Sequence, residues 1–104
     1  MRVVVKVHRT AETDYRAWQA RLRQPPTGNA GIARLHAEEL FRRLIDSQGE
    51  PPNSEKDESQ NPPIYVWRYA NDTWIRFIHR DETGRFGSRV RKVVILGIAT
   101  SRPE

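Results

Sequence analysis

The sequence predicts an α+β fold in which two N-terminal helices pack on one face of a four-stranded, mainly antiparallel sheet. Two observations support this prediction. Four segments carry the alternating or β-branched apolar pattern of strands, one at the start of the chain and three in its second half. Two segments between them repeat apolar residues at helical spacing. With 104 residues, of which 37% are apolar, the chain is expected to form a single domain over 1–104 with a lean core.

The first predicted strand covers residues 2–8, where Val3, Val5 and Val7 share one face and Arg2, Lys6 and His8 share the other. A helix follows, with Thr10 or Thr13 as its N-cap and two acidic residues in its first turn. Its aromatic and aliphatic residues recur at helical spacing. The helix must end before Pro25, because proline lacks the backbone N–H that a helix interior needs.

The second predicted helix begins near Asn29 and ends before Gly49. Residues 49–63 then change in character: they hold four acidic residues, one lysine, four prolines and no large apolar side chain. This segment carries a charge of −3, which leaves +8 on the rest of the chain. We expect a mobile, solvated loop here. The alternative is that this acidic segment lies against the basic surface of the protein.

The sequence of the second half of the chain predicts a three-stranded meander. Strands are predicted for 64–69, 73–80 and 90–99, with a hairpin turn at Asn71 and a basic loop over 81–89. The predicted order is therefore β-α-α-β-β-β. Helices that both pack on one face of such a sheet leave the other face partly open.

Arginine dominates the charge of this protein. The net charge is +5, and of 18 basic residues only Lys6, Lys56 and Lys92 are lysines. A guanidinium binds phosphate through two hydrogen bonds and stacks on bases, so the preference for arginine over lysine favours RNA or another polyanion as partner. Arginine usage also follows codon bias, which leaves a purely compositional explanation open.

Cysteine is absent, which excludes disulfides, thiolate metal sites and thiol nucleophiles. No apolar window approaches the length of a membrane span, so we expect no membrane association and a cytoplasmic location. The three histidines lie far apart in the sequence, without acidic residues at ligand spacing, and we therefore expect neither a metal nor a cofactor.

Strand alternation indicates which side chains face the open side of the sheet. In 73–80, Ile75 and Phe77 share one face and Arg76 lies on the other. If the apolar pair packs on the helices, Arg76 points outward, together with the basic residues of 2–8. Arg68 is ambiguous, because its strand could turn either the arginine or an aromatic row to the open face. Both arrangements suit single-stranded nucleic acid.

The β-α-α-β-β-β order, the strand Trp74-Ile75-Arg76-Phe77-Ile78-His79 and the last apolar strand running into Arg102 resemble the RelE/ParE toxin superfamily. The resemblance implies a toxin that binds RNA and acts as a metal-independent endoribonuclease on messenger RNA at the ribosome. It also implies an acidic antitoxin protein as partner. The alternatives are a gyrase-directed toxin of the ParE type and a non-catalytic module that binds nucleic acid or protein.

The resemblance assigns the first catalytic candidates to Arg76, which matches the central-strand arginine, and Arg102, which follows the last strand. Tyr69 and His79 are candidates for proton transfer, although alternation places His79 on the other face unless the strand has a bulge there, and His8 is an alternative on the open face. Many RelE-like ribonucleases have a further C-terminal segment with a tyrosine or histidine, whereas this sequence ends at Glu104, so the acid and base stay unassigned. The candidates for holding RNA are Lys6, Arg68, Arg80, Arg85, Arg89, Arg91 and Lys92.

Overall fold

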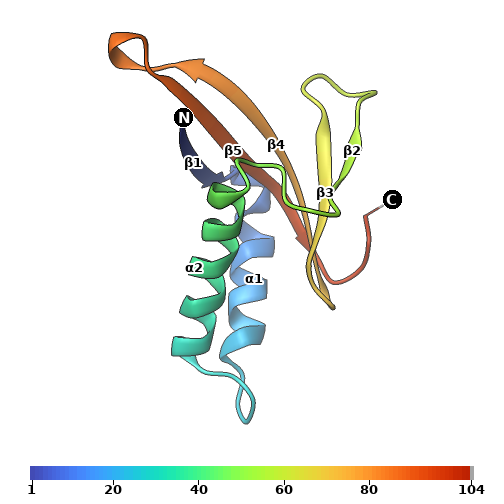
Figure 1. Cartoon of the computed structure of the whole chain (residues 1–104). Helices are drawn as coiled ribbons and strands as arrows, with labels where there is room; N and C mark the ends of the chain where they lie inside the picture. The colour runs from blue at the N-terminus through green and yellow to red at the C-terminus, as the bar shows by residue number, and fades with distance from the viewer. Residues whose placement is uncertain (104) are drawn as a thin grey trace.

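The computed structural model describes residues 1–103 and confirms the α+β class. Its elements, in chain order, are β1 (Arg2–Val7), the 3-10 turn η1 (Arg9–Ala11), α1 (Glu12–Arg23), α2 (Ala30–Asp46), β2 (Glu55–Asp57), β3 (Ile64–Ala70), β4 (Thr73–Thr83), the 3-10 turn η2 (Arg85–Gly87) and β5 (Arg89–Ala99) (Figure 1). Asn29 caps α2 by accepting a hydrogen bond from the backbone N–H of Ile32. Within residues 1–103, neither helix has the length and apolar character that crossing a bilayer requires.

The sheet has five strands in the order β1-β5-β4-β3-β2, and it is mixed. The prediction of four strands is therefore wrong, although the sheet is mainly antiparallel, because three of its four strand pairings are antiparallel. The additional strand, β2, lies inside the acidic segment and pairs with β3; its three residues are all exposed and polar, so they give no apolar periodicity. In addition, β1 runs parallel to β5. The helices separate β1 from the meander, so no tight hairpin fixes its direction.

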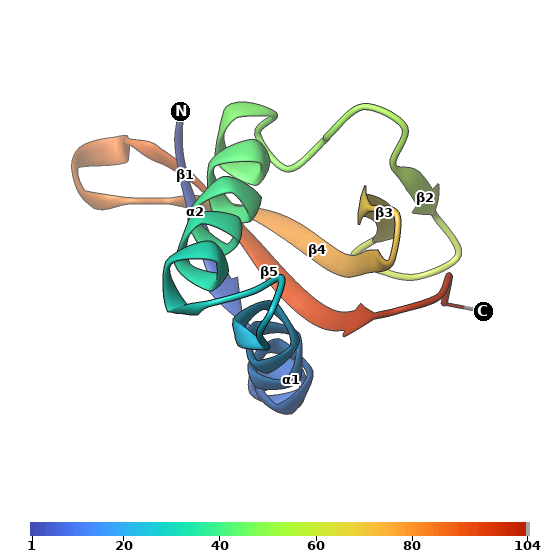
Figure 2. The same ribbon diagram turned by 90° about the horizontal axis from the view of Figure 1, so that it is seen from below.

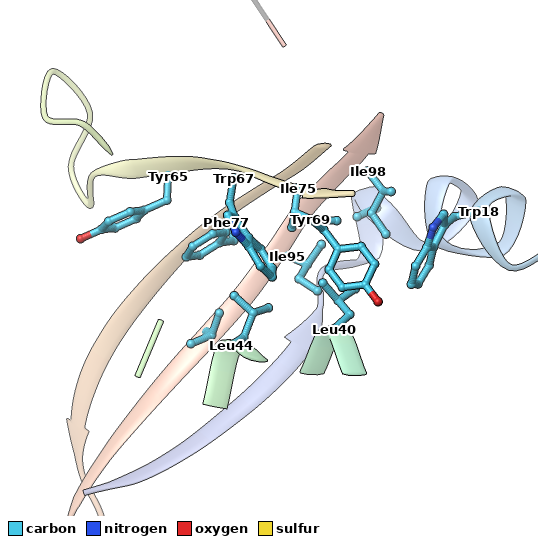
Figure 3. Close-up of a cluster of buried hydrophobic side chains, with 12 residues drawn as sticks. Trp18, Leu40, Leu44, Tyr65, Trp67, Tyr69, Ile75, Phe77, Ile95 and Ile98 are labelled. Atoms are coloured by element: carbon cyan, nitrogen blue, oxygen red, sulfur yellow. The ribbon is translucent and has the colours of Figure 1, made fainter. Parts of the chain in front are cut away.

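The core lies between the helices and one face of the sheet. Figure 3 shows the aromatic row of β3 directed toward side chains of α2 and α1. Ile75 and Phe77 of β4 are completely buried on the same face. This arrangement resolves the ambiguity in β3: its aromatic residues are core, and Arg68 is exposed on the opposite, helix-free face. The buried residues of this core cluster are Ala11, Trp18, Leu40, Leu44, Tyr65, Trp67, Tyr69, Ile75, Phe77, Val93, Ile95 and Ile98.

Helix α1 also covers an edge of the sheet. β1 ends at Val7, opposite Ile95, so the last part of β5 has no strand on that side. There α1 lies beside β5 (Figure 2), and the Asp14 carboxylate accepts a 3.4 Å hydrogen bond from the backbone N–H of Ile98. This contact satisfies a donor that an open edge would leave unpaired.

The β4–β5 hairpin continues beyond the helices as an arm, which projects from the body in Figure 1. Its two strands stay paired as far as Thr83 and Arg89. Between them, residues 84–88 form the turn of the arm, in which Phe86 and Gly87 both have positive φ. The arm therefore presents a short basic turn away from the core.

Candidate nucleic-acid interface

Strand register places a set of basic side chains on the helix-free face. β1 contributes Arg2 and Lys6, since its valines at 3, 5 and 7 lie opposite the inward-facing positions of β5. Across the sheet follow Lys92 of β5, then Arg76 and Arg80 of β4, then Arg68 of β3. Partly buried apolar side chains fill the positions between them, namely Val4, Ile64, Val66, Trp74, Ile78, Val90 and Val94. The helix-free face is therefore an apolar surface on which basic side chains are distributed.

Most cations on this face have no acidic partner. Lys92 forms a 2.9 Å ion pair with Glu82, and the hydrogen bond from Lys92 lowers the pKa of that carboxyl group. Within residues 1–103, no ion pair involves the other basic residues of this face, which are Arg2, Lys6, Arg68, Arg76 and Arg80. All five are exposed and available to an anionic ligand.

Arg68 is held over an aromatic ring. Its guanidinium lies 5.5 Å from the centre of the Trp74 ring and donates a 2.8 Å hydrogen bond to the carbonyl of Asn71. Trp74 was not among the site residues predicted from the sequence. It could have been included, because Trp74 and Arg76 are two residues apart on one strand and therefore share the open face. An arginine stacked on a partly exposed tryptophan is a platform on which a base could also stack.

Arg76 and Arg102 line one groove of about 370 Å³ at the β2 edge of this face. β2 contributes Glu55 and Asp57 to the same groove, and Arg102 forms an ion pair with Glu55. The acidic segment thus contacts the basic surface, in agreement with the alternative considered from its charge. Hydrogen bonds from Ser59 lower the pKa of Asp57, so its carboxylate is ionised at neutral pH.

β5 has a bulge opposite Arg76. Arg76 lies opposite Gly97, whereas the next residue of β4, Phe77, lies opposite Ile95, so β5 carries one extra residue. A Cβ on Gly97 would lie 3.8 Å from the Arg76 guanidinium. Because the extra residue is in β5, the alternation of β4 is unbroken and His79 stays on the helix-covered face.

Tyr69 is on the face opposite to Arg76 and Arg102. Its hydroxyl is 3.0 Å from His36 Nδ1, and burial raises its pKa to about 12. Only 8% of Tyr69 is exposed. A phenol in this position contributes to the contact between β3 and α2 and does not reach the groove.

His79 is also on the helix-covered face. Its ring stacks on Tyr65 at a centroid distance of 4.9 Å, and its Nε2 atom, which has no hydrogen-bond partner within residues 1–103, lies 3.7 Å from Glu50. Burial lowers its pKa, with a smaller contribution from nearby Arg91. The structure therefore does not bring either proton-transfer candidate to the two arginines of the groove.

Arg91 and His8 have local structural roles. Arg91 donates two hydrogen bonds to Asp81, at 2.6 and 3.0 Å, and a third to the carbonyl of Gln48. His8 caps η1, where its Nδ1 accepts a hydrogen bond from the backbone N–H of Thr10. Within residues 1–103, His, Asp and Glu side chains form no group of three that could hold a metal ion.

The remaining candidates, Arg85 and Arg89, lie in the arm. Together with Arg2 they line a hollow of about 840 Å³ at the base of the turn. Phe86, at the tip, is fully exposed. Phe86 was not predicted as a site residue from the sequence. The feature that could have indicated it is an aromatic residue between two glycines in a basic loop.

We compared the chain with protein-family models, with curated proteins and with solved structures, and none of the three comparisons returned a match. The resemblance to the RelE/ParE toxin superfamily rests on the motif residues and the order of elements alone.

Proposed function

We propose that this protein binds single-stranded RNA along the helix-free face of its sheet. The observation that carries this proposal is the row of five exposed cations, Arg2, Lys6, Arg68, Arg76 and Arg80, without an acidic partner within residues 1–103. Four of the five are arginines, which bind phosphate in a bidentate manner.

The apolar positions between these cations favour a single strand over a duplex. A duplex presents mainly its phosphates and sugars, whereas a single strand can also place its bases on an apolar surface. Trp74, next to Arg68, is the best-placed aromatic residue for such a contact. The spacing of charged and apolar side chains on the face therefore suits alternating phosphate and base contacts.

A second candidate function is cleavage of the bound RNA, in the manner that the RelE/ParE resemblance implies. It is favoured by one observation, the presence of Arg76 and Arg102 in the same groove. In this reaction the 2′-oxygen attacks the adjacent phosphorus, and the bond from phosphorus to the 5′-oxygen breaks. The 2′-hydroxyl proton goes to a carboxylate base, the leaving 5′-oxygen takes a proton from water, and the guanidiniums stabilise the charge on the phosphoryl oxygens.

Two carboxylates are the available proton acceptors in this groove. Glu55 and Asp57 line it, whereas Tyr69 and His79 lie on the other face. Both carboxylates have a partner in the structure, Glu55 in Arg102 and Asp57 in Ser59, so either must leave that partner before it accepts the proton. Release of Glu55 from Arg102 would make both partners available to RNA.

Binding is tested by fluorescence anisotropy with an unstructured oligouridine and with a duplex. Wild type should bind the single strand more tightly, and Arg76→Ala should weaken that binding. Arg34→Ala is the matched control, since Arg34 is an exposed arginine on α2 whose side chain is 82% accessible. Equal losses in the two variants would show that only net charge matters and would refute the proposed surface.

Cleavage is tested separately by inducing the protein in bacteria and following growth and messenger RNA. The proposal predicts growth arrest and fragmented transcripts with wild type, and loss of both with Arg76→Ala or Arg102→Ala. Intact transcripts after incubation with ribosomes would refute cleavage and leave binding in place. Arrest with intact transcripts and DNA damage that depends on gyrase would instead support the ParE-type alternative.

A further inference from the structure

The tip of the β4–β5 arm displays an aromatic side chain in a constrained conformation. Phe86 is fully exposed, and its φ of 60° lies in the left-handed region that side chains other than glycine rarely adopt. The turn is closed by the hydrogen bond from Gly84 N–H to the Ser88 carbonyl and by that from Ser88 Oγ to the Arg85 carbonyl. The turn therefore holds the phenyl ring away from the rest of the protein.

A single exposed apolar residue is common and by itself indicates nothing. Phe86, however, lies next to a cluster of arginines. Arg2, Arg85 and Arg89 line the hollow at the base of the turn, and none of the described residues that line it is acidic. Within residues 1–103, none of the three arginines takes part in an ion pair. Three arginines that line one hollow place positive charge around it, which favours the binding of an anion there.

We propose that the arm tip is a second contact for single-stranded RNA, in which the three arginines bind a phosphate group and Phe86 stacks on a neighbouring base. This inference rests on the proposed function, because it takes RNA as the ligand of the protein. It extends that function by carrying the contact from the sheet face, with which it shares Arg2, into the arm and by assigning base stacking to a specific side chain.

The position of the arm makes it continuous with the helix-free face. From Arg76 the strand β4 runs to Thr83, and at a rise of about 3.3 Å per residue this is roughly 23 Å. Arg80 lies between, on the same face as Arg76. An RNA strand that follows β4 from the Arg76 groove would therefore reach the turn at its far end.

The chemistry of the tip favours RNA over a lipid surface. Binding to a membrane requires several apolar side chains that can enter the bilayer together, whereas the turn, residues 84–88, offers one phenyl ring flanked by arginine and glycine. Stacking of one base on one aromatic ring needs no more than this. Aromatic side chains interleaved with cations are the usual means of holding single strands without sequence preference.

The test uses the full chain with Phe86→Ala and Phe86→Trp variants, neither of which should affect folding because Phe86 packs on nothing. With oligouridine, Phe86→Ala should bind about 10-fold more weakly than wild type, which is the loss expected for one stacked base. Phe86→Trp should retain the affinity, and its tryptophan fluorescence should be quenched by the RNA. A duplex and an abasic oligonucleotide should bind wild type and Phe86→Ala equally.

The outcomes separate this inference from the proposed function. If Phe86→Ala binds oligouridine as tightly as wild type while Arg76→Ala does not, the arm contact is refuted and the sheet face is supported. If Phe86→Ala loses the same affinity for the abasic strand, stacking is refuted. Loss of binding to phosphatidylserine vesicles with unchanged RNA affinity would also overturn the inference, in favour of a lipid surface. If wild type binds no RNA, both proposals fail.

Discussion

The salt dependence of RNA binding gives a quantitative check on the proposed interface. For single strands, the slope of log affinity against log salt concentration is about −0.7 for each phosphate that the protein neutralises. The helix-free face carries five cations without an acidic partner within residues 1–103, so contact with all of them predicts a slope of about −3.5. Replacement of Arg76 by alanine removes one contact and should reduce the magnitude of the slope by about 0.7.

The measurement is a titration of labelled oligouridine at several salt concentrations, with wild type, Arg76→Ala and Arg34→Ala. Arg34 pairs with Glu38 on α2, away from the face, so its loss lowers the net charge by the same amount without removing a phosphate contact. The slope of Arg34→Ala should equal that of wild type. The reasoning is refuted if Arg76→Ala leaves the slope unchanged, or if both variants reduce it equally.

Three further predictions concern stability. Leu44 is completely buried between α2 and the sheet, so Leu44→Ala should lower the free energy of unfolding by about 2–5 kcal/mol in urea titrations; a loss below 1 kcal/mol would contradict this packing. Burial lowers the pKa of His79 below its ordinary value of 6.5, so the unfolded chain binds the proton more readily. Wild type should therefore lose stability as the pH falls below 6.5, and in His79→Gln this decline should be shallower. Finally, Phe86→Gly should raise the free energy of unfolding by about 0.5 kcal/mol in urea titrations, because glycine tolerates the positive φ at that position but gains entropy in the unfolded chain. A decrease would indicate that the phenyl ring packs on the protein.

Alternation of apolar residues was sufficient to assign β4 correctly. Ile75 and Phe77 had to share a buried face, so Arg76 had to be exposed on the other one, and the structure agrees. β3 could not be assigned in this way, because aromatic residues and Ile64 and Val66 both suit a core. Only the helix contacts of β3 show that the aromatic row is buried.

The elements that sequence reasoning missed depend on contacts between distant segments. β2 has three polar, exposed residues, and its strand conformation comes from pairing with β3 rather than from its own pattern. The parallel pairing of β1 with β5 likewise involves residues at opposite ends of the chain. The separation of Tyr69 and His79 from Arg76 has a local origin, because alternation along β3 and β4 places both residues on the helix-covered face.

The parallel pairing of β1 with β5 has a consequence for how the protein folds. Arg2 lies opposite Val90, so β1 cannot pair with β5 until almost the entire chain has been synthesised. Contacts between such distant residues slow folding, because the entropy of closing a long loop is lost before the strand pairing contributes any stability. During synthesis β1 is then an unpaired apolar segment. β5 lies between β1 and β4, so a chain shortened before β5 could not bring the cations of β1 beside those of β4 and would lack part of the proposed RNA surface.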